Sequence, residues 1–272
     1  MNVFLLFQKL DGIWLQNLEE NVFFIVHKDI KPYPSISCLS LKNCSISLQE
    51  GMTRRRTMAR NQFTNTLAAY PYLTRLDLSQ NCFAGVFDEI GDALKQNLVY
   101  LNIRECDLID RDVEYLANSR HAKSLRHLNI SRVCGLFPDD DFAVSSRVLV
   151  DCLKNFSNIT VIHLQQNQMT DQRSAGLCDV IRNHWPRLKC LNILDNIFST
   201  EAVITIVQAC AEVPSVQVLK LPYAHNMLQG VALMSTGRAQ FEQRVRRELK
   251  SLGRDDINVE ISNLAYAILA NA

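Results

Sequence analysis

The chain has 272 residues, with 29 basic and 28 acidic side chains and a formal net charge of +1. This balance creates no field that would attract nucleic acid or an anionic membrane, so we expect neither as a partner. Hydrophobic residues make up 47% of the sequence, which is enough for a continuous core and excludes a disordered chain.

Residues 1–32 contain apolar clusters that do not match the pattern of the rest of the chain. The apolar run at residues 3–7 is short and no basic segment precedes it, so we expect no secretory signal. We predict that residues 1–32 form an N-terminal cap or a degenerate repeat.

From residue 33 onward the pattern Leu-x-x-Leu-x-Leu-x-x-Asn/Cys-x-apolar recurs about seven times, at intervals of roughly 25 to 37 residues. This is the leucine-rich repeat signature, in which each unit is a short strand followed by a helical return. We therefore predict an α/β solenoid, a horseshoe with a concave parallel sheet and convex helices, over residues 33–235. The repeats start at Ile36, Leu73, Leu98, Leu125, Ile159, Leu188 and Val216.

Two longer units carry charge clusters. Residues 54–56 are three arginines, which we place on a solvated helix face; a nuclear-localisation signal or an acidic-partner patch is the alternative. Residues 139–141 are three aspartates, which we place at the start of a helix that continues from Phe142, where negative charge is favourable. A cation site is the alternative there, although the glycine and distal glutamate of an EF-hand loop are absent.

The later units predict their helices most clearly. Leu177, Val180 and Ile181 share one face of a helix that starts after Thr170, and Ser199 is a candidate N-cap for the next helix. Residues 236–272 are predicted to form a C-terminal cap of helix, strand and tail. The helix, residues 238–252, ends at Gly253 and has Phe241, Val245, Leu249 and Leu252 facing inward; residues 257–261 alternate as a strand.

Nine cysteines occur without any Cys-x-x-Cys pair, so a zinc ribbon is not indicated. Cys44, Cys106 and Cys134 are predicted to occupy the Asn/Cys position of the repeat, where a small side chain turns inward. We interpret the cysteines as structural thiols in a reducing compartment, and expect a cytoplasmic or nuclear location.

The sequence has no Gly-rich phosphate loop, no His-Glu-x-x-His and no Gly-x-Ser-x-Gly. We therefore expect no enzyme activity, no cofactor and no metal site. In each repeat the residues that flank the strand leucines should line the concave face, because side chains alternate along a strand. The candidate partner-binding residues on that face are Arg75, Asp77, Tyr100, Arg104, His127, His163 and Lys220.

Residues 159–261 resemble the closing repeats of the PRAME family, whose broader relatives include leucine-rich repeat-containing protein 14. The resemblance is carried by the run from Val161 to Ser199, by Val-Leu-Lys-Leu-Pro-Tyr at residues 218–223, and by an arginine-rich helix that ends in Gly253-Arg254. It covers roughly residues 33–261. It implies a substrate-recognition subunit of a cullin-RING ubiquitin ligase, in which the horseshoe reads the substrate and an amino-terminal box docks elongins B and C.

No such box precedes residue 30, and the one spacing match, Leu78, Cys82 and Val86, lies inside a repeat. An elongin–cullin complex is therefore expected only if an upstream segment is missing from this chain. Taken together, the residues and the resemblance predict a protein–protein interaction scaffold of the ligase-adaptor type that binds its target on the concave face. The alternative is a stand-alone repeat protein that binds and inhibits a partner.

Overall fold

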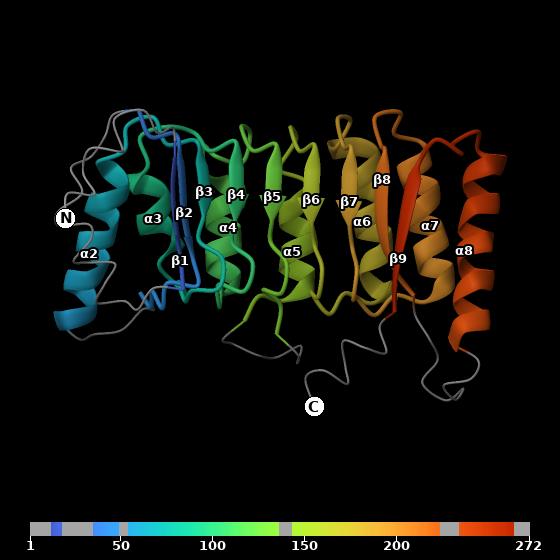
Figure 1. Ribbon diagram of the computed structural model, residues 1–272, viewed down its shortest axis with the longest axis horizontal. Coiled ribbons are helices and arrows are strands. Elements are labelled where there is room, and N and C mark those ends of the chain that lie inside the picture. The colour runs from blue at the N-terminus through green and yellow to red at the C-terminus, as the bar shows by residue number, and fades with distance from the viewer. Residues whose placement is uncertain (1–11, 18–34, 49–53, 136–142, 224–233, 264–272) are drawn as a thin grey trace, which may run out of the picture.

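The computed structural model describes residues 12–17, 35–48, 54–135, 143–223 and 234–263. From β2 onward, strands and helices alternate along this part of the chain (Figure 1). The strands are β1 (Gly12–Gln16), β2 (Cys38–Lys42), β3 (Arg75–Asp77), β4 (Tyr100–Asn102), β5 (His127–Asn129), β6 (Val161–His163), β7 (Cys190–Asn192), β8 (Val218–Tyr223) and β9 (Asn258–Asn263). The helices are α2 (Arg54–Ala68), α3 (Phe87–Ala93), α4 (Asp110–Asn118), α5 (Ser146–Leu153), α6 (Asp171–His184), α7 (Thr200–Ala211) and α8 (Met234–Ser251).

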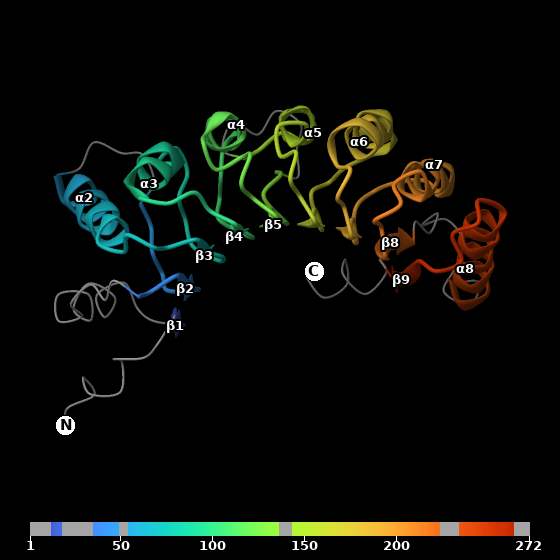
Figure 2. The ribbon, with the colours of Figure 1, turned by 90° about the horizontal axis from the view of Figure 1, so that it is seen from above.

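All nine strands form one parallel sheet in chain order, from β1 to β9. Figure 2 shows this sheet on the inner side of an arch, with the helices along the outer side. The predicted α/β repeat solenoid is therefore confirmed. The sheet also extends beyond the seven predicted repeat strands, because β1 pairs with β2 and β9 pairs with β8.

The core follows from the register of this sheet. In the three-residue strands β3 to β7 the middle residue points away from the concave side and is buried, and its register partner Leu219 in β8 continues this apolar row under the sheet. The register partners at its centre, each at most 1% exposed, are Leu76, Leu101, Leu128, Ile162, Leu191 and Leu219. Because one face of every strand is buried, a slip of one residue would place polar side chains in the core.

Buried asparagines connect successive repeat turns. The Asn196 side-chain oxygen accepts hydrogen bonds from the backbone N–H groups of Asn167 (3.0 Å) and Met169 (3.1 Å). Its amide donates to the carbonyls of Leu164 and Ile193, both at 2.9 Å. One side chain thus satisfies four backbone groups that are buried in a turn, where an unpaired group would cost free energy.

Asn81 and Cys106 occupy the same position in other units. Asn81 accepts from the backbone N–H groups of Cys44 and Ile46, and the Cys106 thiol donates to the carbonyl of Leu78 at 3.1 Å. The assignment of Cys134 to this position is wrong.

In the unit that follows β5, Val133 occupies the position that Asn81 and Cys106 hold in theirs, and it is 4% exposed. Val133 brings no hydrogen-bonding side chain, so its turn depends on Asn167 of the next unit, whose side-chain oxygen accepts from the N–H of Val133 at 3.0 Å. Cys134 lies one residue further along and is only half-buried.

The predicted inward face of α6 and the predicted N-cap of α7 are both confirmed. Leu177, Val180 and Ile181 are buried on α6, and the Ser199 hydroxyl caps α7 by accepting from the N–H of Ala202 at 3.2 Å. The described residues before α5 correct another prediction. The α5 helix begins at Ser146, so it does not continue from Phe142; residues 136–142, with the aspartate triplet, lie outside the described residues.

At the C-terminal end, α8 and β9 overlap the helix predicted at residues 238–252 and the strand predicted at 257–261, but α8 begins at Met234, inside the range predicted for the repeats. Phe241, Val245 and Leu249 of α8 are buried, but Leu252 is 46% exposed. Leu252 follows the last residue of α8, and the backbone reverses immediately after it at Gly253, where φ is +70°. The adjacent Arg254 closes the end of the preceding repeat.

The Arg254 guanidinium donates to the carbonyls of Ala211, Val213 and Val216, at distances of 2.6 to 3.0 Å. These carbonyls lie at the C-terminal end of α7 and in the turn that leads to β8. A planar guanidinium can reach several acceptors at once, which an ammonium group cannot do in the same geometry.

None of the described helices is long and apolar enough to cross a membrane. Residues 54–56 begin α2, so the arginine triplet lies in a helix as predicted. The tail at residues 264–272 and most of residues 1–32 lie outside the described residues.

Replacing Asn196 by alanine should lower the free energy of unfolding by about 3 kcal/mol, because four buried backbone groups lose their partner. Urea unfolding at pH 7 measures the change. The matched control is Asn183→Ala on the exposed face of α6, where one surface bond to Asp179 is lost and a change within about 0.5 kcal/mol is expected. Equal effects at the two positions would contradict the role of the buried amide.

Candidate functional site

The concave face is built from two rows of side chains, one on each side of the buried middle row. The first row comprises the register partners Gly12, Cys38, Arg75, Tyr100, His127, Val161, Cys190, Val218 and Asn258. The second row comprises Trp14, Ser40, Asp77, Asn102, Asn129, His163, Asn192, Lys220 and Glu260. Parallel strands in register bring equivalent residues of successive repeats side by side.

Four of the predicted residues form a continuous chain of contacts across β3 to β6. The Arg75 guanidinium lies over the Tyr100 ring, 4.8 Å from its centroid. The Tyr100 and His127 rings are 4.6 Å apart, and the His127 and His163 rings are 5.3 Å apart. We call Arg75, Tyr100, His127 and His163 the concave strip.

The other predicted residues lie beside the strip. Asp77 accepts a hydrogen bond from the Asn102 amide at 3.0 Å, and Lys220 forms an ion pair with Glu260 at 2.7 Å. Arg104 lies outside the two rows, two residues beyond β4 on the rim of the arch, and forms an ion pair with Glu105.

Glu105 is the centre of a charged group on this rim. Burial acts to raise its pKa, but hydrogen bonds from Gln80 and Arg104 and the charge of Arg132 outweigh that effect, so the pKa of Glu105 lies below its ordinary value. The sequence prediction placed Arg104 in the same lateral row as Tyr100. The structure instead assigns Arg104 to this rim group.

Trp14 is a concave residue that the sequence prediction missed. It is 62% exposed and pairs with Ser40 in the second row. Gly12 makes room for it, because a Cβ at Gly12 would lie only 2.6 Å from the indole ring. The alternation of Ile13, Trp14 and Leu15 was the available signal, but the segment lacked the rest of the repeat pattern.

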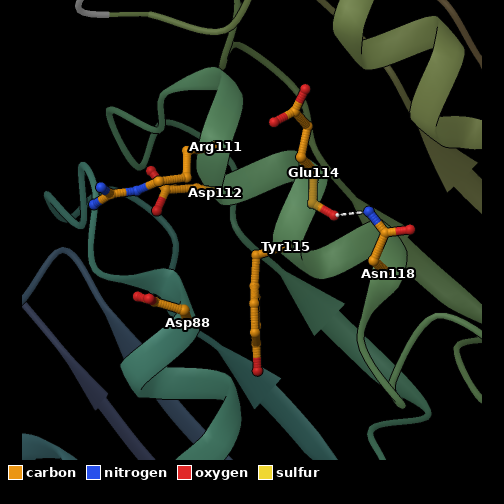
Figure 3. Close-up of a pocket in the computed structure, with 6 residues that line it drawn as sticks. All are labelled: Asp88, Arg111, Asp112, Glu114, Tyr115 and Asn118. Atoms are coloured by element: carbon orange, nitrogen blue, oxygen red, sulfur yellow. Dashed lines mark hydrogen bonds between the residues drawn. The ribbon is translucent and has the colours of Figure 1, made fainter.

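The convex side has a small hollow between α3 and α4, which Figure 3 shows with its lining residues. Its most buried member, Asp112, accepts hydrogen bonds from the backbone N–H groups of Gly85, Phe87 and Ile109 at 2.8 to 3.1 Å. Asp112 therefore joins the starts of two neighbouring helices. The hollow is explained by helix capping, and no reactive arrangement is seen in it.

The buried thiols fit a structural role. Burial raises the pKa of Cys106 and of Cys210, which keeps both thiols protonated and unreactive. Within the described ranges, no group of three or more His, Cys, Asp or Glu side chains is placed to hold a metal ion.

No protein family model matches the chain, and no curated protein is significantly similar to it. Among solved structures, the tropomodulin C-terminal domain of Caenorhabditis elegans is similar to the chain at 17% sequence identity, with a TM-score of 0.40. The alignment covers 58% of this chain and 90% of that chain. At this identity and TM-score, the likeness assigns no function and no partner to this chain.

The strip should make stability depend on pH. Burial, the neighbouring His163 ring and Arg75 lower the pKa of His127 from its ordinary 6.5 to about 4. Below pH 6.5, His127 binds a proton in the unfolded chain, whereas in the folded chain it stays neutral until about pH 4. The contribution of His127 to the free energy of unfolding should therefore be complete above pH 6.5 and should be lost as the pH falls towards 4.

We expect the wild-type chain to lose about 1 kcal/mol more stability than His127→Gln between pH 7 and pH 4.5, since the half-exposed ring is partly screened by solvent. Urea unfolding of both proteins at the two pH values measures this difference. Parallel losses in the two proteins would show that His127 titrates normally.

Proposed function

We propose that this chain is a protein-interaction scaffold that binds its target on the concave face. The concave strip carries the proposal: an exposed guanidinium and three half-buried rings, a phenol and two imidazoles, contact one another on the concave side. Arginine and aromatic side chains contribute most of the binding energy at protein interfaces, especially at the centre of the contact. The arch places this strip at its middle strands (Figure 2).

The side chains of the strip are preorganised for binding. Each ring packs against the ring of a residue on an adjacent strand. Little side-chain freedom therefore remains to be lost when a partner binds. The sheet beneath is fixed by the buried leucine row and the asparagine turns. A rigid, half-buried aromatic surface is typical of a recognition surface whose partner adapts to it.

The resemblance of residues 159–261 to the PRAME family supports a more specific proposal. On that proposal, the bound protein is a substrate that the chain presents to a cullin-RING ubiquitin ligase. The alternative is a scaffold that blocks its partner simply by occupying the partner's surface. Both forms need the same concave face, and they differ in what else accompanies the captured protein.

The double substitution Arg75→Ala with Tyr100→Ala should reduce capture of the partner at least tenfold, because it removes the cation and the ring that begin the strip. Affinity-tagged wild-type and variant chains, expressed in the same cells, are compared by quantitative mass spectrometry of the proteins they retain. The melting temperature should change by less than about 4 °C, because both side chains are partly exposed.

The control is Arg147→Ala with Asp151→Ala, which removes an exposed ion pair from convex helix α5. This variant should capture the partner as the wild-type chain does. Loss of capture in the convex variant alone would place the binding surface on the helices and contradict the proposal. Recovery of a cullin or an elongin together with the partner would support the ligase form; recovery of the partner without either would support the blocking form.

A further inference from the structure

In the second concave row, the side-chain NH₂ of Asn129 differs from its neighbours, because no residue in the described part of the chain pairs with it. Asp77, Asn102, Asn129 and Asn192 occupy equivalent positions in their strands. In each of the four, a side-chain oxygen accepts a hydrogen bond from the N–H two residues further along the chain, at 2.9 to 3.2 Å. This shared bond fixes which way each side chain is turned, and leaves the amide NH₂ of each asparagine facing the concave side.

Two of these NH₂ groups have partners on a neighbouring strand. Asn102 donates to the carboxylate of Asp77 at 3.0 Å, and Asn192 pairs with Nδ1 of His163 at 3.1 Å. The NH₂ of Asn129, which stands between them at the centre of the row, has no hydrogen-bond partner among the described residues. Within the described residues no protein group pairs with the Asn129 NH₂, so this half-buried donor is available to an acceptor that another molecule brings.

His163 adds a second donor beside Asn129, with which it is in register. The Asn192 oxygen is occupied by the N–H of Leu194, so its NH₂ is the group that meets His163. Nδ1 of His163 must therefore accept, and the proton of the neutral ring must be on Nε2. Asn129 and His163 thus offer N–H donors side by side.

The charges around the two imidazoles favour an anion there. Burial is the largest cause that lowers the pKa of both histidines; Arg75 and the His163 ring act further on His127, and Lys220 acts further on His163. No carboxylate opposes these effects on either ring.

Of the nearest acids, Asp77 keeps its charge, because Ser79 and Asn102 are neutral donors. That charge acts on Tyr100 and not on either imidazole. Glu260 pairs with Lys220 at the edge of the sheet. The remaining flanking groups, Tyr100 and Cys190, are neutral, because burial raises the pKa of each. The local field at the imidazoles is therefore positive.

We propose that the partner places the carboxylate of an aspartate or glutamate side chain against Asn129 and His163. The carboxylate accepts from the Asn129 NH₂ and from Nε2–H of His163, and it lies between the positive groups Arg75 and Lys220. Donors that are already positioned bind a carboxylate more strongly than a neutral acceptor. The inference rests on the proposed function, since it specifies the chemistry of the partner at the concave face.

Asn129→Asp is a sharp test because it changes one group and keeps the fold. Asp77 shows that an aspartate fits this strand position with the same bond to the N–H two residues on, at 2.9 Å. At position 129 the substitution would retain the bond to Ser131 and replace the NH₂ donor by a charged oxygen. A site that receives a carboxylate should then reject it and accept a cation.

The experiment selects a phage-displayed library of random peptides, about 12 residues long, on the wild-type chain and on Asn129→Asp. The wild-type chain should enrich aspartate or glutamate at one fixed position of the aligned peptides. The variant should lose that enrichment and select lysine or arginine there, and a synthetic wild-type peptide should bind it at least tenfold more weakly. Asn61→Asp on the exposed part of α2 is the matched control and should select as the wild-type chain does.

Failure of the inference and failure of the proposed function give different results. Peptides that bind Arg75→Ala with Tyr100→Ala as well as the wild-type chain do not use the concave strip, and that outcome contradicts the proposed function. Peptides that require the strip but show no acidic position, or keep it unchanged in Asn129→Asp, overturn only the carboxylate proposal. Thermal unfolding of Asn129→Asp confirms that the comparison is made on a folded protein.

Discussion

The register of the parallel sheet is the constraint on which the rest of this structure depends. It is held from within, by the buried row that includes Leu101 and Leu128, and from the turns, by asparagines such as Asn196 that bind two repeats at once. Since side chains alternate along each strand, fixing the buried row also fixes the rows beside it. The concave face is therefore a consequence of the core, and its side chains are aligned from strand to strand without further cost.

Alignment allows isolated surface residues to act together. A tyrosine or a histidine alone on a strand would be an ordinary half-exposed side chain. Arg75, Tyr100 and His127 are in register and contact one another, and the His163 ring packs diagonally against His127 from the other row. Burial, with the neighbouring positive groups, lowers the pKa of both imidazoles, and the NH₂ of Asn129 beside them is open to an acceptor.

The repeat pattern predicted the fold and most of the concave face, because both follow from a period of two within strands and from the spacing between repeats; Arg104 was assigned to that face but lies beyond the end of β4. It placed Arg75, Tyr100, His127 and His163 on one face correctly. It failed at Cys134, where the inward position of the turn is one residue earlier, at Val133. It also failed at Trp14, because the strand that carries Trp14 lacks the rest of the repeat pattern. Contacts such as those of Arg254 and Asp112 join residues far apart in the sequence, so they depend on how the repeats stack and could not be predicted from any local pattern.

Chemical modification of histidines tests most directly whether a partner lies on the concave strip. Diethyl pyrocarbonate modifies accessible imidazoles, and mass spectrometry gives the rate for His127 and His163 on the strip and for His184 at the end of convex helix α6. With a captured partner bound, the rates at His127 and His163 should fall several-fold while the rate at His184 stays unchanged. Protection of His184 with no protection of the two strip histidines would contradict a concave binding surface.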